Sequence, residues 1–199
     1  MVVNSGLVAT ADASPNPVCE GEDLQLSASG GDTYNWSGPN GFTSNEQNPL
    51  IIGIGILGNG LYTVTVSDQT GSEATASVNV TVNPLPVASA SANPNPICVG
   101  VELSLFASGG VGYVWAGPGG FASNDQNPVI AAVTPANAGT YTVTVTDVNG
   151  CISTASVNVT VNPSPVATAS ASPNPIEEGE DLLLFASGGD TYSWSGPSG

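Results

Sequence analysis

Apolar and polar residues alternate along several short stretches of this chain, and the alternation has a period of two. The clearest stretch covers residues 139–146, in which Tyr141, Val143 and Val145 alternate with threonines. A second run of alternating valines follows at 157–161, after an Asp-Val-Asn-Gly turn. Because successive side chains of a strand point to opposite faces, the two runs predict an antiparallel hairpin with one buried face.

The same pattern extends over the whole of residues 83–161 and contains no helical period. It gives about seven short strands with turn signals roughly every 8–12 residues, which is typical of an immunoglobulin-like antiparallel sandwich. Residues 117–127 form a turn-rich connection in this interpretation. The most clearly predicted strands cover residues 87–92, 102–108, 129–133, 140–145 and 156–161.

The pattern repeats along the chain with a fixed period. Trp36, Trp115 and Trp194 are 79 residues apart, and each lies in the same Gly-Gly-x-x-Tyr-x-Trp context. The period predicts an all-β array of tandem immunoglobulin-like sandwiches at 1–82, 83–161 and 162–199. The third copy contains only the first three predicted strands and is too short to bury a core unaided. We expect it to be completed by further chain or by strands of another subunit.

The aromatic residues of each repeat are expected in its core. The Trp lies on the third strand and faces inward by period two. Tyr141 follows an Asn-Ala-Gly-Thr turn at the start of the sixth strand, and this arrangement is typical of a tyrosine corner. The predicted core residues are Trp36, Trp115, Trp194, Tyr62 and Tyr141.

The charge of the chain excludes several classes of function. It has 16 Asp and Glu residues, no Lys, Arg or His, and a formal net charge of −16. Nucleic acid is therefore excluded as a partner, because phosphate recognition needs cations. Without His or Lys there is no ordinary general base, so we expect no enzymatic activity. No apolar run approaches the 18 residues of a membrane span, so no membrane insertion is expected in this segment.

Three motifs carry a resemblance to a known group of repeats. They are GTYTVTVTDVNGC at 139–151, Cys-x-Gly at 98–100 and Gly-Gly-x-x-Tyr-x-Trp at 109–115. Together they resemble the tandem Ig-like, PKD-like and SprB-type repeats of large bacterial cell-surface adhesins and extracellular filaments. The resemblance implies a secreted or cell-surface array without chemistry of its own. Repeat 1 departs from the pattern at Ser72, which replaces a cysteine, and at 52–55, which we expect to distort its fifth strand.

The cysteines allow two disulfide pairings. Cys98 with Cys151 would close a loop inside repeat 2, but strand two and the last strand begin at opposite ends of a sandwich. With about seven residues per strand these starts are roughly 20 Å apart, which exceeds disulfide reach. In a head-to-tail array the far end of one domain meets the near end of the next. We therefore favour an interdomain Cys19–Cys151 bond, with the Cys98–Cys151 bond and free or intermolecular thiols as alternatives.

Acidic residues near the predicted junction suggest one metal. Glu20, Glu22 and Asp23 offer only oxygen ligands, which suit Ca²⁺, so they form a candidate calcium site. Against this, they lack the alternate-residue spacing of a dedicated calcium loop. No other cofactor is indicated.

These observations favour a structural segment of a long extracellular protein that forms a stalk or filament with an adhesive or scaffolding role. Pro84, Pro86, Pro163 and Pro165 stiffen the predicted joints, so the array should be a semi-rigid rod. Its expected partners are copies of itself or neighbouring repeats, and surface glycans or proteins. The alternative is a binding module that uses inter-strand loops such as 38–48. That loop is nearly identical in repeats 1 and 2, which favours a structural role.

Overall fold

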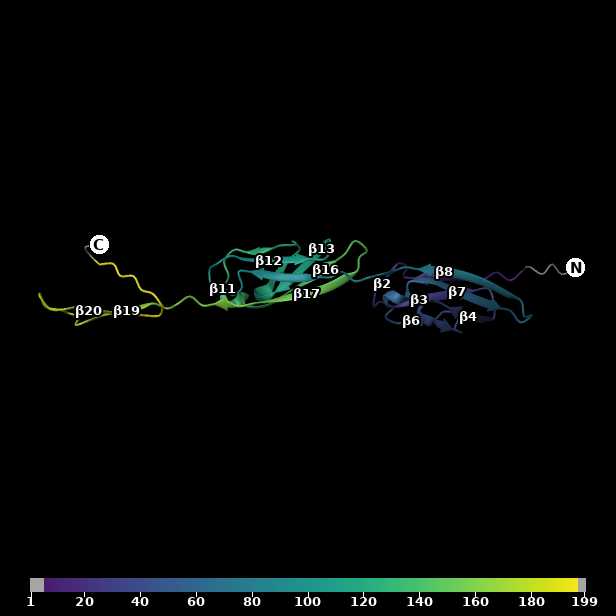
Figure 1. The fold of residues 1–199 in the computed structure, drawn as a ribbon, viewed down its shortest axis with the longest axis horizontal. Coiled ribbons are helices and arrows are strands. Elements are labelled where there is room, and N and C mark those ends of the chain that lie inside the picture. The colour runs from purple at the N-terminus through teal and green to yellow at the C-terminus, as the bar shows by residue number, and fades with distance from the viewer. Residues whose placement is uncertain (1–5, 197–199) are drawn as a thin grey trace.

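The computed structural model describes residues 6–196 and has an elongated shape, with two β-sandwiches end to end and a hairpin after them (Figure 1). The chain is all-β, as predicted, and residues 6–196 contain short 3₁₀ turns but no α-helix. The sheets are antiparallel except for one short parallel pair in each sandwich. The immunoglobulin-like architecture expected from the strand pattern is therefore present in both full repeats.

The first sandwich packs a three-stranded sheet, in the order β1-β3-β6, against a four-stranded sheet, in the order β5-β4-β7-β8. Its elements are β1 (Thr10–Ser14), β2 (Val18–Cys19), β3 (Leu24–Ser29), β4 (Thr33–Ser37), η1 (Pro39–Gly41), β5 (Thr43–Ser44), β6 (Leu50–Ile51), η2 (Ile56–Gly58), β7 (Gly60–Ser67), β8 (Glu73–Val80) and β9 (Val82–Asn83).

The second sandwich repeats this topology, with sheets in the orders β10-β12-β15 and β14-β13-β16-β17. Its elements are β10 (Ser89–Asn93), β11 (Ile97–Cys98), β12 (Leu103–Ser108), β13 (Gly112–Gly117), η3 (Pro118–Gly120), β14 (Phe121–Ser123), β15 (Val129–Ile130), η4 (Pro135–Asn137), β16 (Gly139–Thr146), β17 (Ile152–Val159) and β18 (Val161–Asn162). The registers match at a shift of 79 residues: Trp36 lies opposite Val64, and Trp115 opposite Val143.

The first strand of each sandwich is split between the two layers, which the sequence pattern did not predict. β1 pairs with β3, whereas β2 runs parallel to β9, directly after the end of β8. Asn16 fixes the crossing, since its side chain donates to the Asn79 carbonyl (2.9 Å) and accepts from the Thr81 amide (3.0 Å). The split places Cys19 at the end of the sandwich where the chain leaves for the next repeat.

The core of each sandwich is built around the aromatic residues that recur at the same positions in the repeats. Trp36 and Trp115 are completely buried, and the indole of each donates a 3.3 Å hydrogen bond to the carbonyl of a glutamine, Gln47 or Gln126. The inward positions of the second strand, which include Leu24 and Leu103 and their alternate neighbours, are also fully buried. Burying these side chains stabilises each sandwich by roughly 25 cal/mol per Å² of apolar surface.

Each sandwich contains the predicted tyrosine corner. The Tyr62 hydroxyl donates to the Gly58 carbonyl, and the Tyr141 hydroxyl to the Asn137 carbonyl, both at 2.9 Å. Burial raises the pKa of both tyrosines. Gly38 packs against the Tyr62 ring so closely that a methyl group there would overlap it. The corner therefore needs a residue without a side chain at this position.

Trp194 does not occupy a core, and its prediction as a core residue is wrong for this structure. Its side chain is 48% exposed, whereas Trp36 is completely buried. Within residues 162–196 the third repeat forms only β19 (Thr168–Ser172) and β20 (Leu183–Ser187), which pair with each other. No four-stranded sheet lies over this hairpin in the described residues, so Trp194 has no second layer to pack against.

Two other local expectations also need correction. Residues 117–127, expected as a connection, include β14, which pairs with β13 at the edge of its sheet. Residues 52–55 do not distort the fifth strand of repeat 1, because β6 pairs with β3 as β15 pairs with β12. β9 and β18 end one residue beyond the predicted domain limits at 82 and 161; those limits remain predictions.

We predict that Gly38→Ala destabilises the first sandwich by about 1–3 kcal/mol, because the new methyl group displaces the buried Tyr62 ring. Gly55→Ala is the matched control: nothing lies within 4 Å of its added Cβ, and its backbone (φ −87°, ψ 169°) suits alanine. Urea unfolding followed by tryptophan fluorescence measures both. Equal unfolding midpoints for the two variants would contradict the steric role of Gly38.

Candidate functional site

The junction between the two sandwiches is the candidate functional site. The chain leaves the first sandwich at Asn83, whose carbonyl accepts from the Glu20 amide at 2.8 Å. It enters the second sandwich through the proline-containing segment 84–88. There the Ser153 hydroxyl donates a 2.6 Å hydrogen bond to the Pro86 carbonyl. The linker is therefore bonded to the sandwich on each side of it.

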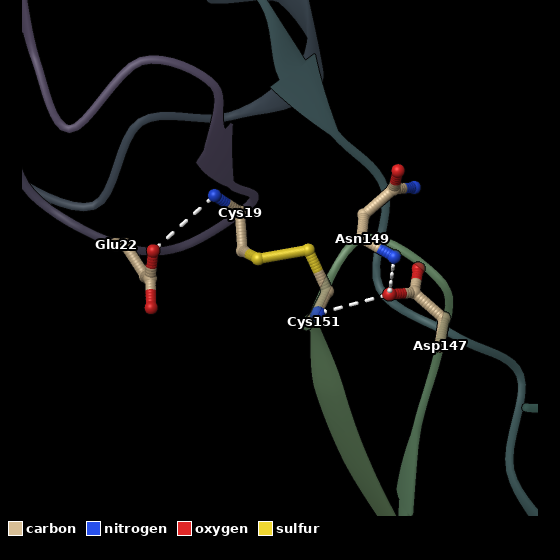
Figure 2. The surroundings of a disulfide bond; sticks show 5 residues. All are labelled: Cys19, Glu22, Asp147, Asn149 and Cys151. Carbon is tan, nitrogen blue, oxygen red and sulfur yellow. Dashed lines mark hydrogen bonds between the residues drawn. A yellow bond between two sulfur atoms is a disulfide. The ribbon is translucent and has the colours of Figure 1, made fainter. Parts of the chain in front are cut away.

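A disulfide joins the two sandwiches across this junction. Cys19 of the first is bonded to Cys151 of the second, 132 residues later in the chain, with their Cα atoms 5.6 Å apart (Figure 2). This is the pairing favoured by the head-to-tail arrangement. The alternative Cys98–Cys151 bond does not form in the structure, where Cys98 is exposed and unpaired.

A side-chain-capped turn holds Cys151 at the junction. One carboxylate oxygen of Asp147 accepts from the Asn149 amide (2.8 Å) and from the Cys151 amide (2.9 Å), as Figure 2 shows. The Asp147 amide in turn donates to the Cys151 carbonyl at 2.9 Å. Aspartate favours such turns because its side chain reaches backbone amides two or more residues ahead. The turn presents Cys151 to the first sandwich in one fixed orientation.

Repeat 1 has the same turn without the cysteine. Asp68 accepts from the amides of Thr70 (2.8 Å) and Ser72 (2.9 Å), and Ser72 stands where repeat 2 has Cys151. The Thr70 hydroxyl, followed by the Ser72 amide, holds the pKa of Asp68 below its usual value. The turn geometry is therefore independent of the disulfide, which is an addition to an existing loop.

The candidate calcium site is not assembled. The carboxylate of Glu22 accepts from the Cys19 amide (3.2 Å), and that of Asp23 from the Gly53 amide (2.8 Å). Glu20 lies at the surface of the junction. Within residues 6–196 no three acidic, His or Cys side chains are grouped closely enough to hold a metal ion. The prediction is corrected because two of its three residues serve as hydrogen-bond acceptors for neighbouring backbone.

Sequence reasoning missed several residues at the junction. Asp147 was interpreted only as part of a hairpin turn, and Ser153 was not singled out at all. A cleft of about 390 Å³ lies beside the disulfide, lined by residues of both sandwiches and by Leu85 of the linker. One signal in the sequence could have indicated the capped turn. An aspartate stands four residues before Cys151 in repeat 2 and four residues before Ser72 in repeat 1.

The comparisons with known proteins return structural likeness at low identity. No protein-family model and no curated protein sequence matches the chain. A bacteriophage RB49 outer capsid protein, Hoc, is 19% identical over 92% of this chain and 69% of its own, with a TM-score of 0.43. A 1.5-MDa bacterial ice-binding adhesin is 14% identical over 85% and 70%, with a TM-score of 0.41. Murine CEACAM1b is 14% identical over 78% and 100%, with a TM-score of 0.39.

No helix within residues 6–196 has the length and apolar character needed to cross a bilayer.

We predict that peptide mapping without reductant recovers a fragment that links Cys19 to Cys151. In the same sample Cys98 should react with iodoacetamide, because its thiol is exposed and unpaired in the structure. A protease that cuts at acidic or aromatic residues is needed, since the chain has no Lys or Arg. A fragment that links Cys98 to Cys151 would contradict the junction described above.

Proposed function

We propose that this chain is a structural segment of an extracellular, cell-surface stalk or filament, in which successive sandwiches are held in fixed end-to-end arrangement. The observation that carries the proposal is the Cys19–Cys151 disulfide, because a covalent bond between two domains is of use where their relative orientation matters. Such bonds persist in oxidising compartments, which supports a location outside the cell. The role would need no chemistry of its own.

The remaining junction contacts support the same role. Short linkers with two prolines are stiff, and this one is bonded at both ends, through the Asn83 carbonyl and the Pro86 carbonyl. Interfaces between domains of one chain normally permit relative motion unless they are large and apolar. A disulfide beside a short linker restricts bending without requiring a large interface. The assignment of these repeats to the tandem Ig-like, PKD-like or SprB-type repeats of bacterial surface proteins is part of this proposal.

The repeat structure supports extension of the arrangement along an array. Cys98 occupies the same place in the second sandwich as Cys19 in the first, since β11 pairs with β18 as β2 pairs with β9. The Val99 amide donates to the Asn162 carbonyl at 3.0 Å, as Glu20 does to Asn83. The chain thus leaves the second sandwich through the same backbone contacts as it leaves the first. In this proposal neighbouring repeats are the main partners of each sandwich.

We predict that Cys151→Ser makes the joint flexible. Small-angle X-ray scattering of the variant should show a broader distribution of end-to-end distances and a smaller radius of gyration than the oxidised wild type, because bent arrangements become accessible. Cys98→Ser is the matched control, since it removes an exposed thiol that is unpaired in the structure. If oxidised wild type and Cys151→Ser scatter identically, the disulfide does not set the geometry and the proposed role fails.

A further inference from the structure

The first sandwich carries large exposed aliphatic side chains at positions where the second has smaller ones. Ile52 is 78% exposed, Ile56 44% and Leu57 70%. The residues 79 positions later in repeat 2 are Ala131, Pro135 and Ala136. Three large aliphatic side chains of one loop thus gather as a patch around one cleft, whereas exposed apolar residues that are scattered singly need no explanation.

The fold does not require these side chains. Ile54, in the middle of the loop, is buried, and its carbonyl accepts from the Gly21 amide at 2.8 Å. Val133 is buried in the same way, and its carbonyl accepts from the Gly100 amide at 2.8 Å. η2 and η4 follow at corresponding positions. The loop therefore has the same backbone contacts in both sandwiches, with different exposed side chains.

The patch borders a cleft that has one acidic residue in its wall. The cleft has a volume of about 520 Å³ and lies between the η1 and η2 turns, with Phe42 and Tyr62 also in its lining. Glu20 contributes the carboxylate, which accepts no hydrogen bond from any residue that the structure describes, unlike Glu22 and Asp23. Repeat 2 has Val99 at the position of Glu20.

Charge decides which kind of molecule fits this cleft. The chain has a net charge of −16 and no Lys, Arg or His, so every charged side chain of a second copy would repel Glu20. A positive partner for this carboxylate has to come from a different molecule. We propose that the cleft docks a segment of another protein, with an aliphatic side chain between Ile52, Ile56 and Leu57 and a lysine or arginine facing Glu20.

The position of the cleft relates it to the rigid joint. Glu20 lines both this cleft and the one beside the disulfide, in which Cys151 and Leu85 take part. The disulfide holds the second sandwich next to the docking surface. The second sandwich therefore keeps a fixed position relative to a bound segment. Docking adds a binding site to the proposed structural role and is independent of it.

The test uses a synthetic peptide of alternating leucine and lysine, titrated into the full chain and followed by amide NMR shifts. The expected shifts lie at Gly53, Gly55 and Gly58, which line the cleft. The variant Ile52→Ala/Ile56→Pro/Leu57→Ala gives the first sandwich the side chains of the second. Its affinity should fall about tenfold or more, because most of the buried apolar surface is removed. Its charge is unchanged, so general attraction of a cationic peptide persists in it.

Two further variants sharpen the result. Glu20→Gln should weaken binding about two- to fivefold, as expected for an exposed ion pair. The reciprocal variant Val99→Glu/Ala131→Ile/Pro135→Ile/Ala136→Leu should create a second site with shifts in repeat 2, which keeps the proposal testable if the first variant folds poorly. A leucine–glutamate peptide and a serine–lysine peptide should both bind at least tenfold more weakly than the leucine–lysine one.

Several outcomes would overturn the proposal. The first is no shift at the cleft with the leucine–lysine peptide. The second is equal affinity of wild type and the triple variant, which would indicate diffuse charge attraction. The third is self-association of the wild type, measured by sedimentation, that the triple variant abolishes, since the patch would then be an interface between copies of this chain.

Discussion

Every ionised side chain on this molecule carries a negative charge, and the rest of the structure follows from that constraint. No ion pair between side chains can form anywhere in the chain, because Lys, Arg and His are absent from the sequence. Stability within each sandwich therefore comes from apolar burial and hydrogen bonds. The polar groups of the core are satisfied by backbone partners, as the Trp36 indole and the Tyr62 hydroxyl show. Between sandwiches, a covalent bond supplies the attraction that charges cannot.

The joint is assembled from small features of backbone geometry. Two residues of parallel pairing, β2 with β9, bring Cys19 to the end of the first sandwich. A single aspartate, Asp147, shapes the turn that presents Cys151. Both features also occur where no bond is made, at Cys98 and at Ser72. Both halves of the joint thus recur in the other repeat, and in the joint that the structure describes in full a cysteine stands at each of them.

Sequence alone could predict the regular parts of the fold, because alternation and a 79-residue period are strong signals. The long hairpins β7–β8 and β16–β17 and the tyrosine corners follow from it directly. β2 and β9 could not be predicted, because two residues are too short to display a period. Trp194 was misplaced because identical local sequence does not supply the opposite sheet that buries it. Residues 52–55 were interpreted as a distortion of the fifth strand; the strand pairs as in repeat 2, and the differences lie in a left-handed Gly53 after the strand and in the side chains exposed there.

The disulfide also determines how the chain would carry tension. A pull on the two termini passes along the backbone to Cys19, crosses the sulfur bond and continues from Cys151. The intervening backbone, a separation of 132 residues, lies outside this load path. At about 3.4 Å per residue it would add roughly 450 Å of extension if both sandwiches unravelled. While the bond is intact that length stays stored, so the segment would resist stretching as a short link. Reduction of a single bond would convert it into a long, extensible tether.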